Sequence, residues 1–112
     1  MTTYALILFV IAALGGLVMA LKVLKGQFAP WPLSFLHAAL GAAGLGLLLL
    51  AILKGSSDVR VLAALGILVV AALGGFYLAA LHAKKSIAPK AVVLIHAAVA
   101  AIGVVTLITT LL

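Results

Sequence analysis

The stretch TYALILFVIAALGGLVMALKVL, from Thr3 to Leu24, decides the fold because Lys22 is its only charged residue. An α-helix of roughly 20 apolar residues crosses the hydrocarbon core of a bilayer, which is about 30 Å thick. Three further stretches have the same length and character, and they are Leu33–Leu53, Val59–Ala83 and Ala91–Leu112. The sequence therefore predicts four transmembrane helices.

The overall composition supports the same prediction. Of the 112 residues, 69% are hydrophobic and only 7% are charged, whereas soluble proteins contain about 25% charged residues. A soluble fold of this length could not bury so much apolar surface. We therefore expect an all-α integral membrane four-helix bundle that forms one domain over residues 1–112. No basic residue precedes the first apolar run, so this run is expected to be a retained helix and not a cleaved signal.

The chain contains an internal repeat. Ala12-Ala13-Leu14-Gly15-Gly16 recurs as Ala71-Ala72-Leu73-Gly74-Gly75, an offset of 59 positions (71 − 12). The same offset aligns Lys25 with Lys84, Ala29-Pro30 with Ala88-Pro89, His37 with His96 and Gly44 with Gly103. We predict two tandem helical hairpins, 3–53 and 59–112. A hairpin returns the chain to its starting side, so the copies are parallel, related by an axis along the membrane normal, and hold His37 and His96 at one depth.

Local signals mark the predicted helix boundaries. Pro30, Pro32 and Pro89 suit the first turn of a helix, where the missing N–H group would have had no partner. Ser56, Ser57 and Asp58 offer side-chain oxygens that could cap the third helix. These residues place boundaries and predict no chemistry.

The net charge of +6 comes from short connections, and not from the solvated basic face that nucleic-acid binding requires. Lys54 and Arg60 flank the second connection. The remaining basic residues flank the first and third connections, and they are Lys22, Lys25, Lys84, Lys85 and Lys90. Because basic residues concentrate on the cytoplasmic side, the first and third connections are expected in the cytoplasm. Both termini would then lie outside, as in a multi-pass protein of a bacterial inner membrane.

His37 and His96 are the residues that could carry chemistry. A polar side chain inside a bilayer is costly unless it meets a partner, a cavity or a ligand, and no Asp or Glu lies within the predicted helices. Glycines share the helix faces or the depth of the two histidines, and they are Gly15, Gly16, Gly41, Gly44, Gly74, Gly75 and Gly103. This pattern predicts one haem b between the second and fourth helices, ligated by two neutral imidazoles, with the glycines making room for the porphyrin. Lysines near this end would bind the haem propionates, and they are Lys25, Lys84, Lys85 and Lys90.

These histidines and glycines resemble those of small membrane b-type cytochromes, in which histidines from facing helices of a four-helix bundle ligate haem and glycines pack on the ring. The resemblance implies one-electron transfer by an oxidoreductase of quinol or superoxide type, with a quinone or a redox protein as partner. That family usually has four ligating histidines for two haems, whereas this chain has three histidines in all, so a single haem is expected. His82 has no repeat counterpart, and we interpret it as an interfacial residue.

Other functions remain open at this point. The histidines could instead hydrogen-bond between helices, a contact that contributes about 1 kcal/mol, and the glycines could allow close helix packing. The chain could then be a small transporter, although it lacks an intramembrane acid, or an assembly subunit of a larger membrane complex. The two haem ligands could come from one chain or from a homodimer. No nucleophile–base pair or phosphate-binding loop indicates a hydrolase or a kinase, and the absence of cysteine excludes disulfides and thiolate metal ligands.

Overall fold

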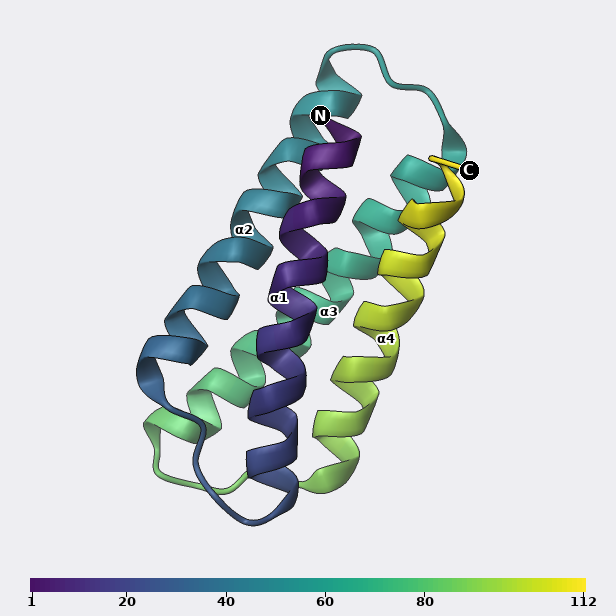
Figure 1. Cartoon of the computed structure of the whole chain (residues 1–112). Helices are drawn as coiled ribbons and strands as arrows, with labels where there is room; N and C mark the ends of the chain where they lie inside the picture. Colours follow the sequence, from purple (N-terminus) through teal and green to yellow (C-terminus); the bar gives the residue numbers. More distant parts are fainter.

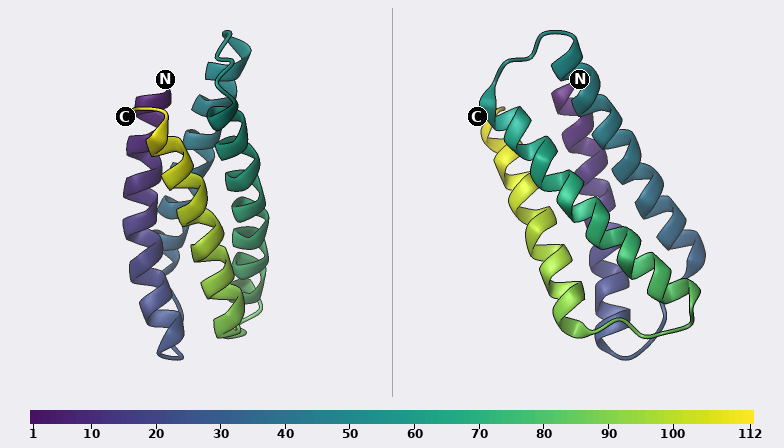
Figure 2. Two further views of the ribbon diagram at one scale, coloured as in Figure 1. Left: turned by 90° about the vertical axis from the view of Figure 1, so that its right-hand side faces the viewer. Right: turned by 180° about the vertical axis from the view of Figure 1, so that it is seen from behind.

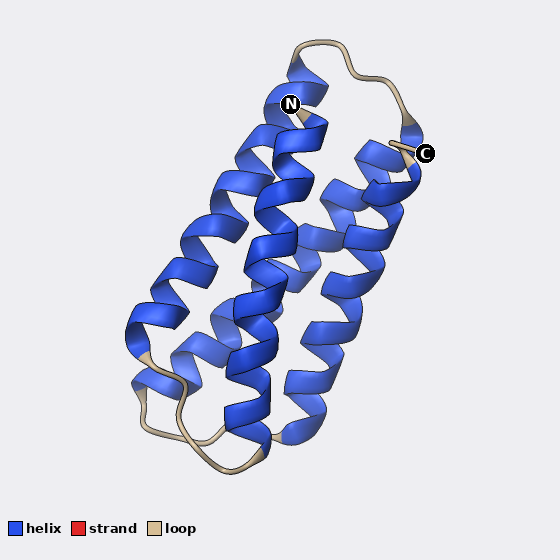
Figure 3. Cartoon of the chain, in the orientation of Figure 1, coloured by secondary structure: helices blue, strands red, loops and turns tan.

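The computed structural model describes Met1–Leu112, and its regular structure is entirely helical (Figure 1, Figure 3). The helices are α1 (Thr2–Leu24), α2 (Trp31–Leu53), α3 (Val59–Ala83) and α4 (Lys90–Thr109). Each of the four is long and apolar enough to cross a membrane. The prediction of an all-α protein with four such helices is confirmed.

The helices form a bundle in which each one contacts two neighbours. α1 packs on α2 and α3 packs on α4, while α1·α4 and α2·α3 contacts join the two hairpins. The pairs α1 with α3 and α2 with α4 therefore stand diagonally opposite. Both termini and the connection between α2 and α3 lie at one end, and the other two connections lie at the opposite end (Figures 1 and 2). We call the latter the loop end, and it is the end with five lysines.

Three helix starts differ from the predicted boundaries. α1 begins at Thr2, α2 begins at Trp31 and α4 begins at Lys90, each slightly earlier than predicted. Pro30 (φ −63°, ψ 132°) and Pro89 (φ −57°, ψ 136°) are extended and precede the helices as N-cap residues. The prediction that these two prolines stand within the first turn is wrong, because an extended residue with no N–H group is compatible with the position just before a helix.

The end of α4 also differs, since the helix stops at Thr109 and not at Leu112. The Thr109 hydroxyl donates to the Thr106 carbonyl at 2.6 Å, and the Thr110 hydroxyl donates to the Leu107 carbonyl at 2.7 Å. In addition, Arg60 Nη1 donates to the Thr109 carbonyl at 2.7 Å. These bonds satisfy carbonyl groups that a helix end leaves without partners, and the arginine ties the start of α3 to the end of α4.

Asp58 caps α3, as predicted. Its Oδ1 accepts from the Arg60 backbone N–H at 2.9 Å, and its Oδ2 forms a 2.9 Å ion pair with Arg60 Nη2. These side-chain and backbone hydrogen bonds lower the pKa of Asp58 below its ordinary value. The folded protein therefore favours the ionised carboxylate.

The Asp58→Ala variant should unfold at a lower temperature than the parent protein, and Asp58→Asn should lie between the two because an amide oxygen can still cap the helix. A lowered pKa means that the stabilisation is complete above about pH 4 and declines as the pH falls further. Thermal unfolding in detergent, followed by circular dichroism at neutral and acidic pH, measures both effects. A difference between parent and Asp58→Asn that persists unchanged at acidic pH would contradict the ion pair.

Three helices end on a residue with positive φ. Gly26 (φ 76°) follows α1, Gly55 (φ 108°) follows α2 and Lys85 (φ 57°) follows α3. The backbone N–H group of the next residue then bonds back over the last turn, as Ser86 does to Leu81 at 2.9 Å. Glycine adopts this left-handed conformation without strain, whereas a lysine in it costs on the order of 1 kcal/mol.

The sealed core lies in the half of the bundle near the termini. Its buried members form one cluster, Ala5, Phe9, Leu48, Val61, Ala64, Leu68 and Leu107. Gly44 and Gly103 are also buried there, and their missing side chains leave room for Phe9 and Leu68. Ala12 and Ala71 are buried at the next level, and Val93 is the only buried residue beyond them toward the loop end. Half of the bundle interior is therefore only partly covered.

Candidate functional site

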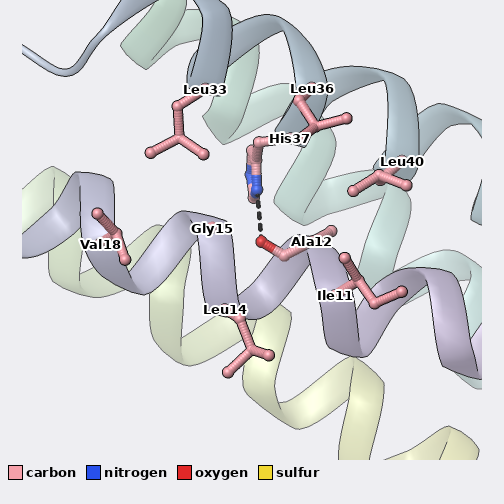
Figure 4. Close-up of a pocket in the computed structure, with 9 residues that line it drawn as sticks. All are labelled: Ile11, Ala12, Leu14, Gly15, Val18, Leu33, Leu36, His37 and Leu40. Carbon is pink, nitrogen blue, oxygen red and sulfur yellow. Dashed lines mark hydrogen bonds between the residues drawn. The ribbon is translucent and has the colours of Figure 1, made fainter.

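His37 projects from α2 onto the backbone of α1. Its Nδ1 atom lies 2.7 Å from the Ala12 carbonyl oxygen (Figure 4). A carbonyl oxygen can only accept, so Nδ1 carries a proton, and a neutral ring in this arrangement has its lone pair on Nε2. The hydrogen bond thus fixes the tautomer and leaves Nε2 free to bind a ligand.

His96 has the same environment in the second hairpin. Its Nδ1 atom donates to the Ala71 carbonyl oxygen at 2.8 Å. Both partners lie 59 positions after those of the first hairpin (96 − 37 and 71 − 12). The two hairpins therefore present two imidazoles with the same protonated nitrogen and the same free nitrogen.

The bundle brings these two imidazoles together. α2 and α4 stand diagonally opposite, and the His37 and His96 ring centroids are 6.3 Å apart with planes at 74°. Both side chains are half-buried. The two histidines thus meet inside the bundle, at the boundary between its sealed core and its partly covered half.

Glycines on α1 and α3 pack against the two imidazoles. A Cβ atom on Gly16 would stand 2.9 Å from His37 Cε1, and one on Gly75 would stand 3.2 Å from His96 Cε1. Gly74 faces His96 Nδ1 at 3.5 Å, whereas Gly15 faces Leu33. In this structure Gly16 and Gly75 therefore make room for the imidazole side chains, and Gly74 is in ordinary contact with His96.

The other predicted glycines have different surroundings. A Cβ atom on Gly44 would stand 2.7 Å from the Phe9 ring, and one on Gly103 would stand 2.6 Å from Leu68 Cγ. Gly41 has no atom within 4 Å of such a Cβ. Gly44 and Gly103 thus allow close packing of side chains in the sealed core, and they lie away from the histidine pair.

A pocket of about 300 Å³ opens in the groove between α1 and α2, beside His37 (Figure 4). Its walls include Leu14, Val18, Leu36 and Leu40, and His37 is its only ionisable lining residue. The first imidazole can therefore be approached through an apolar pocket between the helices of its own hairpin.

The four lysines predicted to bind propionates all lie exposed at the loop end, and they are Lys25, Lys84, Lys85 and Lys90. The only acid of the chain, Asp58, pairs with Arg60 at the other end of the bundle. No carboxylate side chain therefore neutralises these lysines, and an anionic group near this end would meet only positive charge.

The loop end also holds an aromatic cluster that the sequence did not reveal. His82 stacks on Trp31 with centroids 3.9 Å apart and planes at 4°, and on Phe28 at 5.8 Å and 12°. One feature of the sequence indicated where His82 lies, because His82 follows Gly75 by seven positions and so shares its helix face. The pairing with Trp31 depends on how α3 meets α2, which no local pattern reports.

The histidine pair is the main candidate for a metal-binding function. No group of three or more His, Asp or Glu side chains converges anywhere in the chain. Comparison with protein-family models, curated proteins and solved structures finds no match for this chain. The geometry of the site is therefore the basis on which a function is assigned.

Proposed function

We propose that this chain is an integral membrane haem protein that transfers electrons, with His37 and His96 as the axial ligands of one haem b. The observation that carries the proposal is the pair of imidazoles facing each other inside the bundle, each with its Nδ1 proton on a backbone carbonyl. Metal-ligating histidines usually donate the second ring N–H to a carbonyl or a carboxylate in this way. The carbonyls of Ala12 and Ala71 supply that support.

The separation of the rings supports a shared metal ion. Histidine nitrogens bind metal ions at about 2 Å, so two imidazoles that shared one ion would have to stand close to each other. The ring centroids of His37 and His96 are 6.3 Å apart. Two nitrogen donors are also the number that a six-coordinate haem iron requires from a protein.

The partly covered half of the bundle supports the presence of a cofactor. A porphyrin is a broad apolar plate, and it would add apolar contacts on the loop-end side of the histidines, where only Val93 is buried. Gly16 and Gly75 let the two imidazoles lie close to α1 and α3 at this level. The lysines of the loop end lie on the side toward which propionates would point.

The haem would supply one-electron oxidation and reduction, and the chain would hold and orient it. The hydrogen bonds to Ala12 and Ala71 place a proton on each Nδ1 and fix the direction of each ring. The apolar helix faces would exclude water from the bound group. A lipid-soluble quinol or a redox protein at the loop end would exchange the electron, and superoxide is another substrate compatible with such a site.

The exposed surface of the bundle supports placement in a membrane. Only 12 of 112 residues are buried, while large apolar side chains such as Tyr4, Phe35 and Phe76 are each about two-thirds exposed. Lipid would cover these side chains. The excess of lysine at the loop end supports an orientation with this end in the cytoplasm and both termini outside.

Duplication of one hairpin explains the symmetry of the site. Contacts recur 59 positions apart, as for His37 with Ala12 and His96 with Ala71, and for the contacts of Gly44 and Gly103 with positions 9 and 68. A duplicated hairpin provides two equivalent imidazoles at one level without any further adaptation. We therefore regard the two-copy architecture as the origin of the ligand pair.

The absorption spectrum of the detergent-purified protein, expressed with ample haem and then reduced with dithionite, tests the proposal. The parent protein should show the sharp reduced bands of a haem with two axial histidines. His37→Ala and His96→Ala should each lower the haem content by more than about tenfold, because loss of even a supporting group costs 10- to 100-fold in metal affinity. His82→Ala is the matched control, since it removes a histidine of the same chain outside the pair.

A folded parent protein without a Soret band would exclude the haem. The histidines would then serve as helix–helix contacts, and a small transporter or an assembly subunit would be the better account. Loss of haem in the His82→Ala variant alone would show that His82, and not His37 or His96, is the ligand.

A further inference from the structure

A second pocket, of about 370 Å³, lies at the loop end and is built by both hairpins. The first hairpin contributes Phe28, Ala29, Pro30 and Trp31, and the second contributes His82 and Lys85. This pocket is separate from the histidine pair, because it shares no lining residue with the groove beside His37.

The pocket collects residues at which the two hairpins differ. At the offset of 59 positions the corresponding pairs are Phe28 with Ile87, Trp31 with Lys90, Val23 with His82 and Gly26 with Lys85. By contrast, the same offset relates the equivalent contacts of His37 and His96. Four of the six residues that line the pocket thus differ from their counterparts, so the pocket is asymmetric between the two hairpins.

Lys85 occupies a strained position in this pocket. Its φ angle is 57°, and its counterpart in the first hairpin, Gly26, has a φ angle of 76°. The turn requires a left-handed residue, for which glycine is favoured. A lysine here loses stability relative to glycine, and strain of this kind is often found at binding sites.

The polar groups of the pocket have no partner within the chain. Trp31 and Phe28 stack on the flat face of His82, so the ring can form hydrogen bonds only through the nitrogens on its edge. Neither His82 nor Lys85 forms a side-chain hydrogen bond or an ion pair with another residue. An imidazole N–H and an ammonium group are thus available together beside an aromatic wall.

We propose that this pocket binds the phosphate group of an anionic phospholipid, with Lys85 and His82 as donors. Tryptophan side chains prefer the headgroup level of a bilayer, and basic residues near the membrane surface attract anionic lipids. The stacked rings of Trp31 and Phe28 would hold His82 at that level. The inference rests on the proposed placement in a membrane and is independent of haem.

Binding of phosphatidylglycerol to the parent protein, measured by native mass spectrometry from detergent and compared with phosphatidylcholine, tests this site. Lys85→Gly should raise the unfolding temperature without lipid, because it relieves the left-handed strain, yet weaken phosphatidylglycerol binding about fivefold. His82→Val, which restores the residue of the first hairpin, should also weaken binding. Lys84→Ala removes the same charge one position away, outside the pocket, and should leave binding nearly unchanged.

Equal weakening by Lys85→Gly and Lys84→Ala would overturn the proposal in favour of general attraction to the basic end. No preference for phosphatidylglycerol over phosphatidylcholine would also overturn it. Inorganic phosphate that competes fully with the lipid would assign the pocket to a soluble anion instead. Failure of the parent protein to insert into lipid nanodiscs would contradict the membrane placement on which this inference rests. The haem proposal has a separate test, the absorption spectrum of the same sample.

Discussion

Gly103→Ala and Gly44→Ala are each expected to lower the free energy of unfolding by about 1–3 kcal/mol, the usual cost of overpacking a core. A Cβ atom at position 103 would stand 2.6 Å from Leu68 Cγ and 2.7 Å from its Cδ2. Because Cγ is the branch point of the side chain, the whole leucine must move. At position 44 the same atom would meet the Phe9 ring at 2.7 Å, and a rigid ring in a sealed core has little room to tilt.

Gly46→Ala and Gly66→Ala are the matched controls, since no atom lies within 4 Å of a Cβ at either position. The residues 59 positions away are Val105 and Ile7, so the other hairpin carries a side chain at each corresponding position. Both controls should leave stability unchanged or raise it by up to about 1 kcal/mol, because alanine favours a helix over glycine. Unfolding in detergent by an added denaturing surfactant, followed by circular dichroism, compares the four variants.

A double variant makes the test specific to the contact. Leu68→Ala alone should cost about 2–5 kcal/mol by leaving a cavity. If position 103 faces Leu68, the pair Gly103→Ala with Leu68→Ala should cost clearly less than the sum of the single changes. Additive costs, or equal losses in the Gly66→Ala control, would show that α3 and α4 do not pack through these residues.

The helices could be predicted from the sequence because their signal is local. Four apolar runs separated by short polar connections are sufficient, and the bounds differ by a few residues at most, chiefly at Pro30, Pro89 and Thr109. Those differences have local causes. Proline can stand just before a helix as well as within its first turn, and threonine hydroxyls can take over the last carbonyls of a helix.

The surroundings of the histidines could be predicted only in part. The repeat implied that His37 and His96 lie at one depth, and the structure brings them together. Their hydrogen bonds to the carbonyl groups of Ala12 and Ala71 could not be predicted, since every residue has a backbone carbonyl group. Which carbonyl group accepts the bond depends on how one helix is rotated against the next. For the same reason the glycines of this layer were expected against a porphyrin, whereas Gly16 and Gly75 lie against the imidazoles.

Gly16→Ala is expected to release His37 from the Ala12 carbonyl, and this is the largest effect expected at the site from a residue that binds no ligand itself. The added Cβ would stand 2.9 Å from Cε1 and 3.3 Å from Nδ1, the atom that donates the hydrogen bond. The imidazole must then move away from α1, while the bulk of the helices is unchanged. Gly75→Ala should act in the same direction but less strongly, since its closest approach to His96 is 3.2 Å.

Two measurements separate the effect on the ring from the effect on the cofactor. The ¹⁵N chemical shifts of the histidines, in protein without haem, report which ring nitrogen carries the proton. Gly16→Ala should reduce the population protonated on Nδ1, and it should weaken haem binding about tenfold, as for the loss of other groups that support a metal ligand. Gly41→Ala, one turn from His37 with open space around it, should change neither quantity.

The two outcomes have different meanings, because the hydrogen bond and the haem are separate claims. A changed tautomer with unchanged haem binding would support the contact between the His37 imidazole and Gly16, and it would show that His37 is not a haem ligand. An unchanged tautomer would contradict the contact between the His37 imidazole and Gly16, since an alanine Cβ cannot stand 2.9 Å from the present position of the ring. If both quantities change together and follow the order Gly16, Gly75, Gly41, then the glycines act on the cofactor through the imidazoles that rest on them.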